Sequence, residues 1–405
     1  MGPGILFAGA AIGVSHLVQS TRAGAGWGFG LWWAVVLAMV CKYPAIEAGH
    51  RYTVATGESL LHGYLRLGRW ALGLFMAVVV GSAFITMAAV TAVTAGLCGA
   101  LLGLDWSLPA LSALVLAVTL VICAVGRYHV LDLVMKVMVV ILGLLTVLAV
   151  AVAAAHGPAG HQADPSPAVW SAAGITFLLA LMGWMPTPLD VAVWPSLWIL
   201  EKSRRDRRLP TMQEAMVDFH LGYVVTGVLA LAFLSLGALV MHGTGRALPE
   251  SGVAFGRQLV DMYAEALGPW SRWVISVVAF ITMFSTTLTV LDGYARAMAG
   301  GVGLLVGAGE EARRRAALVL MPVTAALALV VIAFFLKNMR TLVDVATVLA
   351  FLAAPLLAWL NMRVVRGPAV PTEHRPGAKL TVLTWVGLVF LLGFGLVWVW
   401  SRWLR

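Results

Sequence analysis

The chain has 405 residues, of which 61% are hydrophobic and 11% are charged, and its mean hydropathy is +0.94. A soluble globular protein has about 25% charged residues, so this composition excludes a water-soluble fold and indicates an all-α membrane protein with several spans. The formal charge of +9 would suggest a nucleic-acid partner in a soluble chain. In a membrane protein, basic residues gather instead in cytoplasmic loops, so we expect no nucleic-acid partner.

A helix needs about 20 apolar residues to cross a bilayer. The sequence contains eleven windows of at least 18 residues that lack Asp, Glu, Lys and Arg, and it therefore predicts eleven transmembrane helices. In chain order the windows are 2–21, 23–41, 70–104, 106–126, 137–163, 165–189, 221–245, 273–291, 316–336, 345–362 and 380–401.

The Lys and Arg residues between these windows predict the orientation of the chain, because short cytoplasmic loops carry more of them. With the N-terminus inside, 17 basic residues fall on the cytoplasmic side and 8 on the outside. This count includes Arg22, which lies at the outer end of the first window. We therefore predict that the N-terminus is inside and the C-terminus is outside.

Two of the windows are interrupted by residues that break helices. The first has Gly-Val-Ser-His at 13–16, and the sixth has Gly183, Pro186 and Pro188 within six residues. Transporters built from inverted repeats bind their substrate near the middle of the membrane, where one helix of each repeat is broken. A simple proline kink in a packed helix is the alternative for the sixth window taken alone.

The spacing of the two interrupted windows predicts how the chain is divided. Five spans separate them, and an odd spacing inverts the second repeat relative to the first. The sequence thus predicts one transporter domain over residues 1–405, with a first repeat over 1–155, a second over 165–366 and an extra helix over 380–401.

Three short motifs resemble a known family. They are GPGILFAGAAIGVSHLVQSTRAGA at the start, VATGES after the second window and MPT at the break in the sixth. Together they are similar to the Nramp (natural resistance-associated macrophage protein) divalent-metal transporters and their relatives. The resemblance implies the leucine-transporter-like fold of 5+5 inverted repeats and transport by alternating access.

The family's metal-binding residues are only partly present. The motif DPGN aligns with 13–16, so that Gly13 stands in place of the Asp and His16 in place of the Asn. In the motif MPH, Met185 and Pro186 are kept and Thr187 replaces the His. The span-3 carboxylates that the family uses for proton transfer align with Met87 and Val90. The chain is therefore a divergent relative that lacks the formal negative ligand of the usual metal site.

Polar or unusual residues near the two breaks are the candidate substrate ligands, since ionisable groups inside a membrane are costly. His16 and Met185 are the candidate metal ligands, because imidazole and thioether groups suit soft divalent ions. Alternatively, a neighbouring carbonyl satisfies His16 and Met185 only packs. The full set of candidate substrate-binding residues is Gly13, Ser15, His16, Gln19, Met182, Met185, Thr187 and Asp190.

Asp190 is the carboxylate closest in sequence to either break. It could replace the missing Asp as a counter-charge, or it could pair with Arg22. Because the two residues follow breaks in helices of opposite direction, the Arg22 pair is disfavoured, and we expect Asp190 to line a cytoplasmic vestibule. Two further charged pairs within the spans, Asp132 with Lys136 and Lys42 with Glu47, are expected to be structural.

A cluster of hydroxyl residues in the eighth window is a candidate coupling-ion site. In leucine-transporter-like folds a similar cluster provides a sodium site against the first helix, although hydroxyl groups also bond back to their own helix. The candidate residues are Ser285, Thr286, Thr289 and Asp292.

These observations favour a secondary transporter for an inorganic cation, with a divalent metal as the first candidate. The alternatives are a carrier for a small anion or organic metabolite and a sensor that has kept the fold but lost transport. No motif typical of an enzyme is present. We expect an integral protein of a bacterial cytoplasmic (inner) membrane with no resident cofactor. Its partners are the lipid bilayer and a small ion or solute, and the sequence leaves its oligomeric state open.

Overall fold

The computed structural model describes residues 3–125, 128–159, 168–245, 249, 251–335 and 338–403. Over these residues all regular secondary structure is helical, which confirms the predicted class. Eight helical stretches are long and apolar enough to cross a membrane, and two shorter apolar helices, Leu108–Ala124 and Ala172–Gly183, accompany them. The count of eleven spans is therefore not confirmed, because two predicted windows match these shorter helices and two others share the stretch Ser15–Thr56.

The first predicted span is a broken helix. It consists of α1 (Pro3–Ala11), a short non-helical segment at Ile12–Gly13, the π-helical turn η1 (Ser15–Ser20) and α2 (Thr21–Trp27). The chain then turns through η2 (Gly28–Leu31) into α3 (Trp32–Thr56).

The sequence windows placed the end of the first span at residue 21, and this boundary is wrong. The helix continues through Arg22 to Trp27. An arginine can lie within a span when its charge is neutralised inside the bundle, and Arg22 is paired with Asp344.

The next elements complete the first half of the chain. The short helix α4 follows α3, and three longer helices come after it, the last of which ends at His156. Their bounds are α4 (Leu60–Leu67), α5 (Arg69–Leu102), α6 (Leu108–Val125) and α7 (Tyr128–His156).

The second half begins with the other broken helix. Helix α8 (Ala172–Gly183) ends at an irregular segment that contains Pro186 and Pro188. The helix resumes through η3 (Leu189–Ala192) and α9 (Val193–Asp206). The remaining elements are α10 (Met212–Val240), α11 (Gly252–Leu267), α12 (Ser271–Val306), α13 (Glu310–Val330), η4 (Val331–Phe335), α14 (Met339–Val365), η5 (Thr372–His374) and α15 (Ala378–Trp403).

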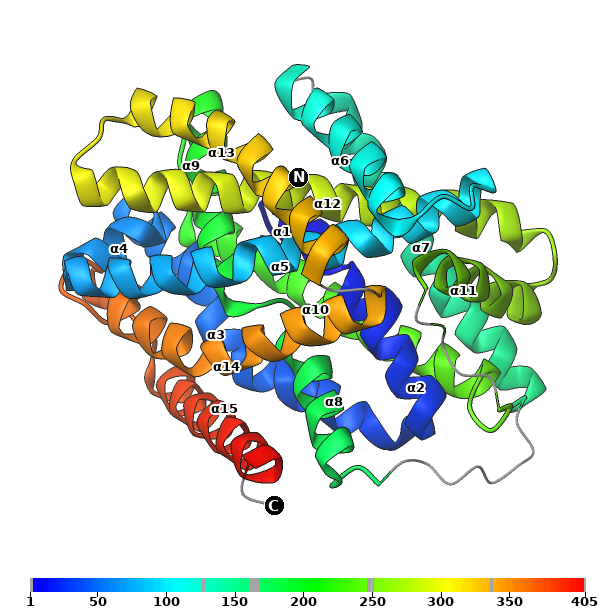
Figure 1. The fold of residues 1–405 in the computed structure, drawn as a ribbon. Helices are drawn as coiled ribbons and strands as arrows, with labels where there is room; N and C mark the ends of the chain where they lie inside the picture. The colour runs from blue at the N-terminus through cyan, green and yellow to red at the C-terminus, as the bar shows by residue number, and fades with distance from the viewer. Residues whose placement is uncertain are drawn as a thin grey trace.

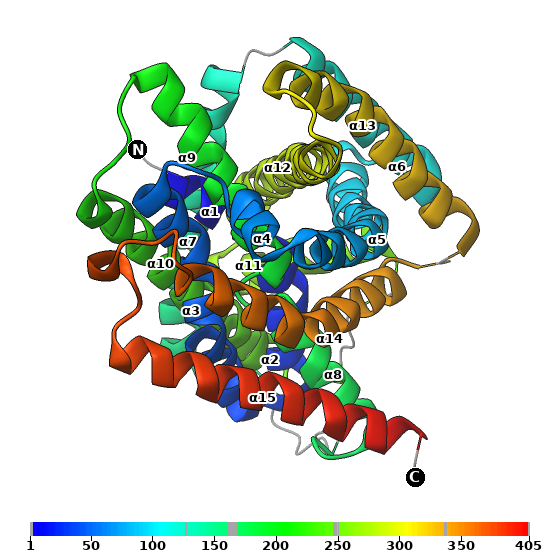
Figure 2. The same cartoon turned by 90° about the vertical axis from the view of Figure 1, so that its left-hand side faces the viewer.

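The helices form one bundle around the two breaks. Helices α5 and α12 pack against each other, and α1 contacts α10 and α12 (Figure 1). Helix α15 lies at the edge of the bundle beside α14 and α3, whereas α13 and α6 lie together on another edge (Figure 2). The first broken helix thus packs mainly against α10 and α12, and the second packs mainly against α14 and α3.

Close approach of α2 and α10 depends on two glycines. A Cβ atom added at Gly24 would lie 1.9 Å from the carbonyl oxygen of Leu234, and one added at Gly237 would lie 2.4 Å from that of Thr21. Small residues at such crossings allow helix backbones to approach closely in membranes, where van der Waals packing contributes much of the association energy. This crossing fixes the second half of the first broken helix, α2, against α10.

Replacement of Gly24 by Val is therefore expected to destabilise the protein. The added side chain would overlap the α10 backbone, and overpacking of this kind costs about 1–3 kcal/mol. The measurement is the thermal unfolding midpoint of the purified protein in detergent. Gly26→Val is the matched control, because a Cβ at Gly26 meets nothing within 4 Å. Equal midpoints for the two variants would contradict this account of the crossing.

Candidate functional site

The break in the first helix lies against a threonine of α12. A Cβ atom at Gly13 would lie 2.9 Å from both Oγ1 and Cγ2 of Thr286, so a larger residue needs the threonine to move. The Thr286 hydroxyl faces the carbonyl oxygens of Gly9 and Ile12, each at 3.4 Å, and that of Thr282 in its own helix at 3.2 Å. The space beside Gly13 is therefore filled by a neutral hydroxyl group.

The break in the second helix follows from its two prolines. Pro186 and Pro188 have no backbone N–H to donate, so a regular helix cannot continue through them. The last carbonyls of α8 lose their helical partners for the same reason. Segment 184–188 leaves the helix and places Trp184, Pro186 and Thr187 beside the first break.

A small cavity of about 30 Å³ lies between the two breaks. This volume holds about one or two water molecules. The lining comes from α1, the start of η1, α5, segment 184–188, η3, α9 and α12, and it contains no acidic or basic side chain. The lining residues are Ala10, Ala11, Val14, Ser15, Thr86, Val90, Trp184, Pro186, Thr187, Pro188, Val191, Trp194, Thr286 and Val290.

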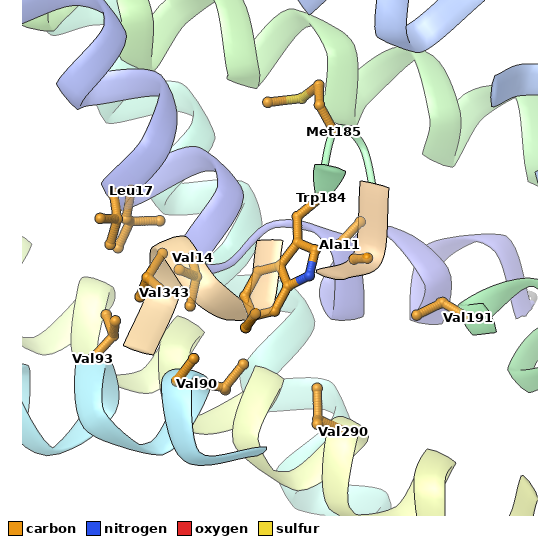
Figure 3. Close-up of a cluster of buried hydrophobic side chains, with 14 of the residues drawn as sticks. Ala11, Val14, Leu17, Val90, Val93, Trp184, Met185, Val191, Val290 and Val343 are labelled. Atoms are coloured by element: carbon orange, nitrogen blue, oxygen red, sulfur yellow. The ribbon is translucent and has the colours of Figure 1, made fainter. Parts of the chain in front are cut away.

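Trp184 is the largest side chain at the meeting point of the breaks. Its ring extends between Val14 and Ala11, above Val90, and its nitrogen faces the side on which Ala11 and Val191 lie (Figure 3). The indole Nε1 and the hydroxyl of Thr187 are both buried without a hydrogen-bond partner. Unsatisfied buried polar groups are rare in proteins. These two groups are thus unpartnered polar atoms of residues that line the cavity.

Lys42 of α3 reaches the second break from the other side. Its side chain is fully buried, and Nζ donates to the carbonyl oxygens of Met182 at 3.1 Å, Gly183 at 2.8 Å and Thr187 at 2.7 Å. Glu47, which the sequence placed with Lys42, instead binds Arg51 one turn further along α3. Both residues have structural contacts, as predicted, but not with each other.

Asp190 lies behind the second break and not among the residues that line the cavity. It is 4% exposed and accepts a hydrogen bond from the Tyr294 hydroxyl at 2.9 Å. Its carboxylate also interacts electrostatically with Lys42. Arg22 pairs with Asp344 instead, so the expectation that Arg22 and Asp190 do not pair is confirmed.

Arg22 takes part in a polar network that joins α2 to α14. Its guanidinium donates to the two carboxylate oxygens of Asp344, at 2.5 and 3.2 Å, and to Oε1 of Gln19 at 2.9 Å. The Gln19 amide in turn donates to Asp344 at 3.2 Å and to Thr347 at 3.3 Å. The structure therefore places the candidate ligand Gln19 in an interhelical clamp.

His16 faces α10 and not the cavity. Its Nε2 lies 2.9 Å from the carbonyl oxygen of Thr226, and its Nδ1 lies 2.8 Å from the hydroxyl of Ser15. A carbonyl can only accept, so Nε2 carries a proton and donates it to Thr226. This is the arrangement in which a neighbouring carbonyl satisfies the histidine, and both ring nitrogens are occupied.

The two methionines of the candidate set are fully buried. The carbonyl of Met182 binds Lys42, and the side chain of Met185 lies on the opposite side of the break from the Trp184 ring (Figure 3). Neither Met185 nor His16 lines the cavity. Among the described residues no three His, Cys, Asp or Glu side chains gather closely enough to hold a metal ion.

The candidate coupling-ion residues separate into different environments. Thr286 faces the first break, whereas the Thr289 hydroxyl donates to the carbonyls of Ser285 and Thr286 in its own helix. Both carboxylate oxygens of Asp292 accept from Nε of Arg296 at 2.8 Å. The structure thus brings Thr286 alone of this set to the first break. The Asp132–Lys136 pair lies outside the side chains that the structure describes.

Comparison with known proteins identifies the family. Residues 4–401 match the natural resistance-associated macrophage protein-like (Nramp) family. The chain belongs to this family. An uncharacterized protein of Pasteurella multocida (strain Pm70) is 36% identical over 405 residues, covering 98% of this chain and 91% of that protein.

Solved structures show the same fold. A manganese transporter of Eremococcus coleocola superposes with a TM-score of 0.70 at 15% identity, covering 99% of this chain and 86% of that one. MhsT in complex with L-phenylalanine gives a TM-score of 0.65 at 15% identity, covering 99% and 98%. The protein is therefore an Nramp-family integral membrane protein with the leucine-transporter-like fold, which confirms the resemblance.

Sequence reasoning missed two residues of the site. Trp184 carried a signal, since it directly precedes the Met-Pro pair of the break, and Lys42 carried another, as a charge that directly follows the second apolar window. Neither signal shows where the side chain points. Only the packing of α3 against the second break reveals what Lys42 contacts.

The Arg22–Asp344 pair is expected to show a measurable coupling energy. The two side chains are 9% and 33% exposed, so water screens them only partly. A double-mutant cycle with Arg22→Met and Asp344→Asn, followed by thermal unfolding, should give a coupling of about 0.5–3 kcal/mol. The exposed pair Arg272–Asp261 is the control and should give less than about 1 kcal/mol. Additive effects of the Arg22 and Asp344 variants would contradict the clamp.

Proposed function

We propose that this Nramp-family protein is a secondary transporter that works by alternating access, with its substrate bound between the two breaks. The observation that carries the proposal is the cavity that residues of both broken helices line together. Broken helices around a central site are the usual binding architecture of transporters built from inverted repeats. The proposal includes one transporter domain over the whole chain, with the N-terminus inside and the C-terminus outside a bacterial cytoplasmic membrane.

The first candidate substrate is an inorganic cation, with a divalent metal tested first. Its support is family membership and the likeness to a solved manganese transporter. The cavity offers such an ion the hydroxyls of Ser15, Thr187 and Thr286 but no carboxylate. Hard divalent ions prefer carboxylates among their ligands, so we expect weak binding of Mg²⁺ in particular.

The second candidate is a small neutral or anionic solute that has hydrogen-bond acceptors. The unpartnered Nε1 of Trp184 favours it, because an indole N–H can donate but cannot coordinate a cation. The rest of the lining around this donor is apolar apart from hydroxyl groups, so it holds no charged side chain that would repel an anion. Thr187, whose hydroxyl is also unpartnered, can donate or accept beside it.

Flux into proteoliposomes distinguishes the two candidates. The panel contains Mn²⁺, Fe²⁺, Mg²⁺, Na⁺, small inorganic anions and small organic acids, with internal pH recorded and protein-free liposomes as the control. Protein-dependent uptake of Mn²⁺ or Fe²⁺ supports the cation, and uptake of an anion or acid without metal flux supports the second candidate. A flux that is unchanged in the double variant Trp184→Ala/Thr187→Val would contradict the cavity as the binding site.

A designed pair of substitutions sharpens the metal test. Gly13→Asp alone should unfold more easily, because its Cβ meets the Thr286 side chain at 2.9 Å. Gly13→Asp combined with Thr286→Ala removes that overlap and restores a carboxylate beside the breaks. We expect the double variant to bind Mn²⁺ at least about tenfold more tightly than the unchanged protein. This change corresponds to a gain of about 1.4 kcal/mol in binding free energy, and calorimetric titration measures it. Equal affinities would show that the missing Asp is not what limits metal binding.

Replacement of Trp184 by Phe tests the donor itself. The variant keeps a large aromatic ring in the cavity and removes only the N–H group. If the substrate accepts a hydrogen bond there, KM should rise by about 5-fold to 100-fold, which corresponds to about 1–3 kcal/mol. Trp385→Phe on the exposed face of α15 is the matched control. An unchanged KM for Trp184→Phe would contradict the acceptor-bearing substrate.

A further inference from the structure

The most unusual polar contact in the protein is the one that Lys42 makes with the second break. Three backbone carbonyls surround its fully buried Nζ at 2.7–3.1 Å. An uncharged amine has two N–H donors, whereas an ammonium group has three. Three carbonyl partners at these distances therefore match the charged form of the side chain.

The carbonyls come from the end of α8 and from the irregular segment of the break. Met182 and Gly183 are the last two residues of α8, where carbonyls lack helical partners and the helix dipole is negative. Thr187 belongs to the irregular segment that follows. Carbonyls of an unwound helix inside a membrane are the groups that transporters of this architecture use to coordinate cations.

The surroundings of Lys42 compensate its charge without exposing it to water. The Asp190 carboxylate interacts with it electrostatically, and the Tyr294 hydroxyl holds that carboxylate. The next charged residues on α3 are Glu47 and Arg51, which are bound to each other. A buried charge is tolerated only when hydrogen bonds and counter-charge satisfy it in this way.

We propose that Lys42 acts as a tethered cation, which occupies with its ammonium group the carbonyl oxygens that a free cation would otherwise coordinate at the second break. The side chain joins the end of α8 and the irregular segment after it to α3, so the break is held in shape without a bound ion. The proposal is independent of which solute the protein carries. It implies that no small cation binds to these carbonyls while Lys42 is present.

Thermal unfolding of the full-length protein in detergent tests the proposal. The buffer contains N-methylglucamine chloride, to which Na⁺, K⁺, Mn²⁺ or ethylammonium is added. At matched ionic strength, ethylammonium is expected to leave the midpoint of the unchanged protein where it is. The response of that protein to each metal cation, which includes any binding in the central cavity, is the baseline for the variants. Lys42→Ala should lower the midpoint by about 5 °C or more, because several charge-assisted hydrogen bonds are lost. Ethylammonium or one of the metal cations should then raise it progressively with concentration, as mass action requires.

Two further variants keep the test informative. Lys42→Gln retains two donors for the carbonyls without the charge, so it is expected to fold and to respond to the same cations even where the alanine variant does not fold. Lys379→Met, at an exposed position on α15, is the control and should match the unchanged protein throughout. An unaltered midpoint for Lys42→Ala, or no cation response in either Lys42 variant, would overturn the proposal. These readouts involve no transport, so their failure is distinct from a failure of the proposed function.

Discussion

Backbone groups that leave a helix inside a bilayer must find hydrogen-bond partners within the protein, because no water is available to them there. The two breaks of this chain meet that requirement with side chains from other helices. Thr286 of α12 faces the carbonyls of Gly9 and Ile12, and Lys42 of α3 binds three carbonyls of the second break. These contacts support the irregular backbone on both sides of the central cavity.

The same requirement explains where the few charges within the spans lie. Arg22 and Asp344 neutralise each other between α2 and α14, and Asp190 accompanies Lys42 behind the second break. Each pair joins elements that are far apart in sequence and adjacent in the bundle. The charges thus connect the broken helices to the surrounding helices, and the cavity itself is left with hydroxyl groups and one indole donor.

The architecture could be predicted from the sequence because its determinants are local. Glycine and proline at 13–16 and 183–188 break helices whatever surrounds them, and the order of apolar windows predicts the repeat. Side-chain direction could not be predicted in the same way. The π-helical turn that begins at Ser15 changes the angle between successive residues, so His16 faces Thr226 and not the cavity. The span boundary near Arg22 failed for a similar reason, since its partner Asp344 is 322 residues away in the chain.

The changes at the two breaks, relative to the family's metal motif, have the same effect on cation binding. At the first break, Gly13 replaces the acid and the Thr286 side chain fills the space beside it. At the second break, an ammonium group occupies the carbonyls. Either change alone would weaken a divalent cation site, the first by removing negative charge and the second by adding a nearby positive charge. The two changes act in the same direction, against binding of a divalent cation, which is the argument for testing the second candidate substrate beside the first.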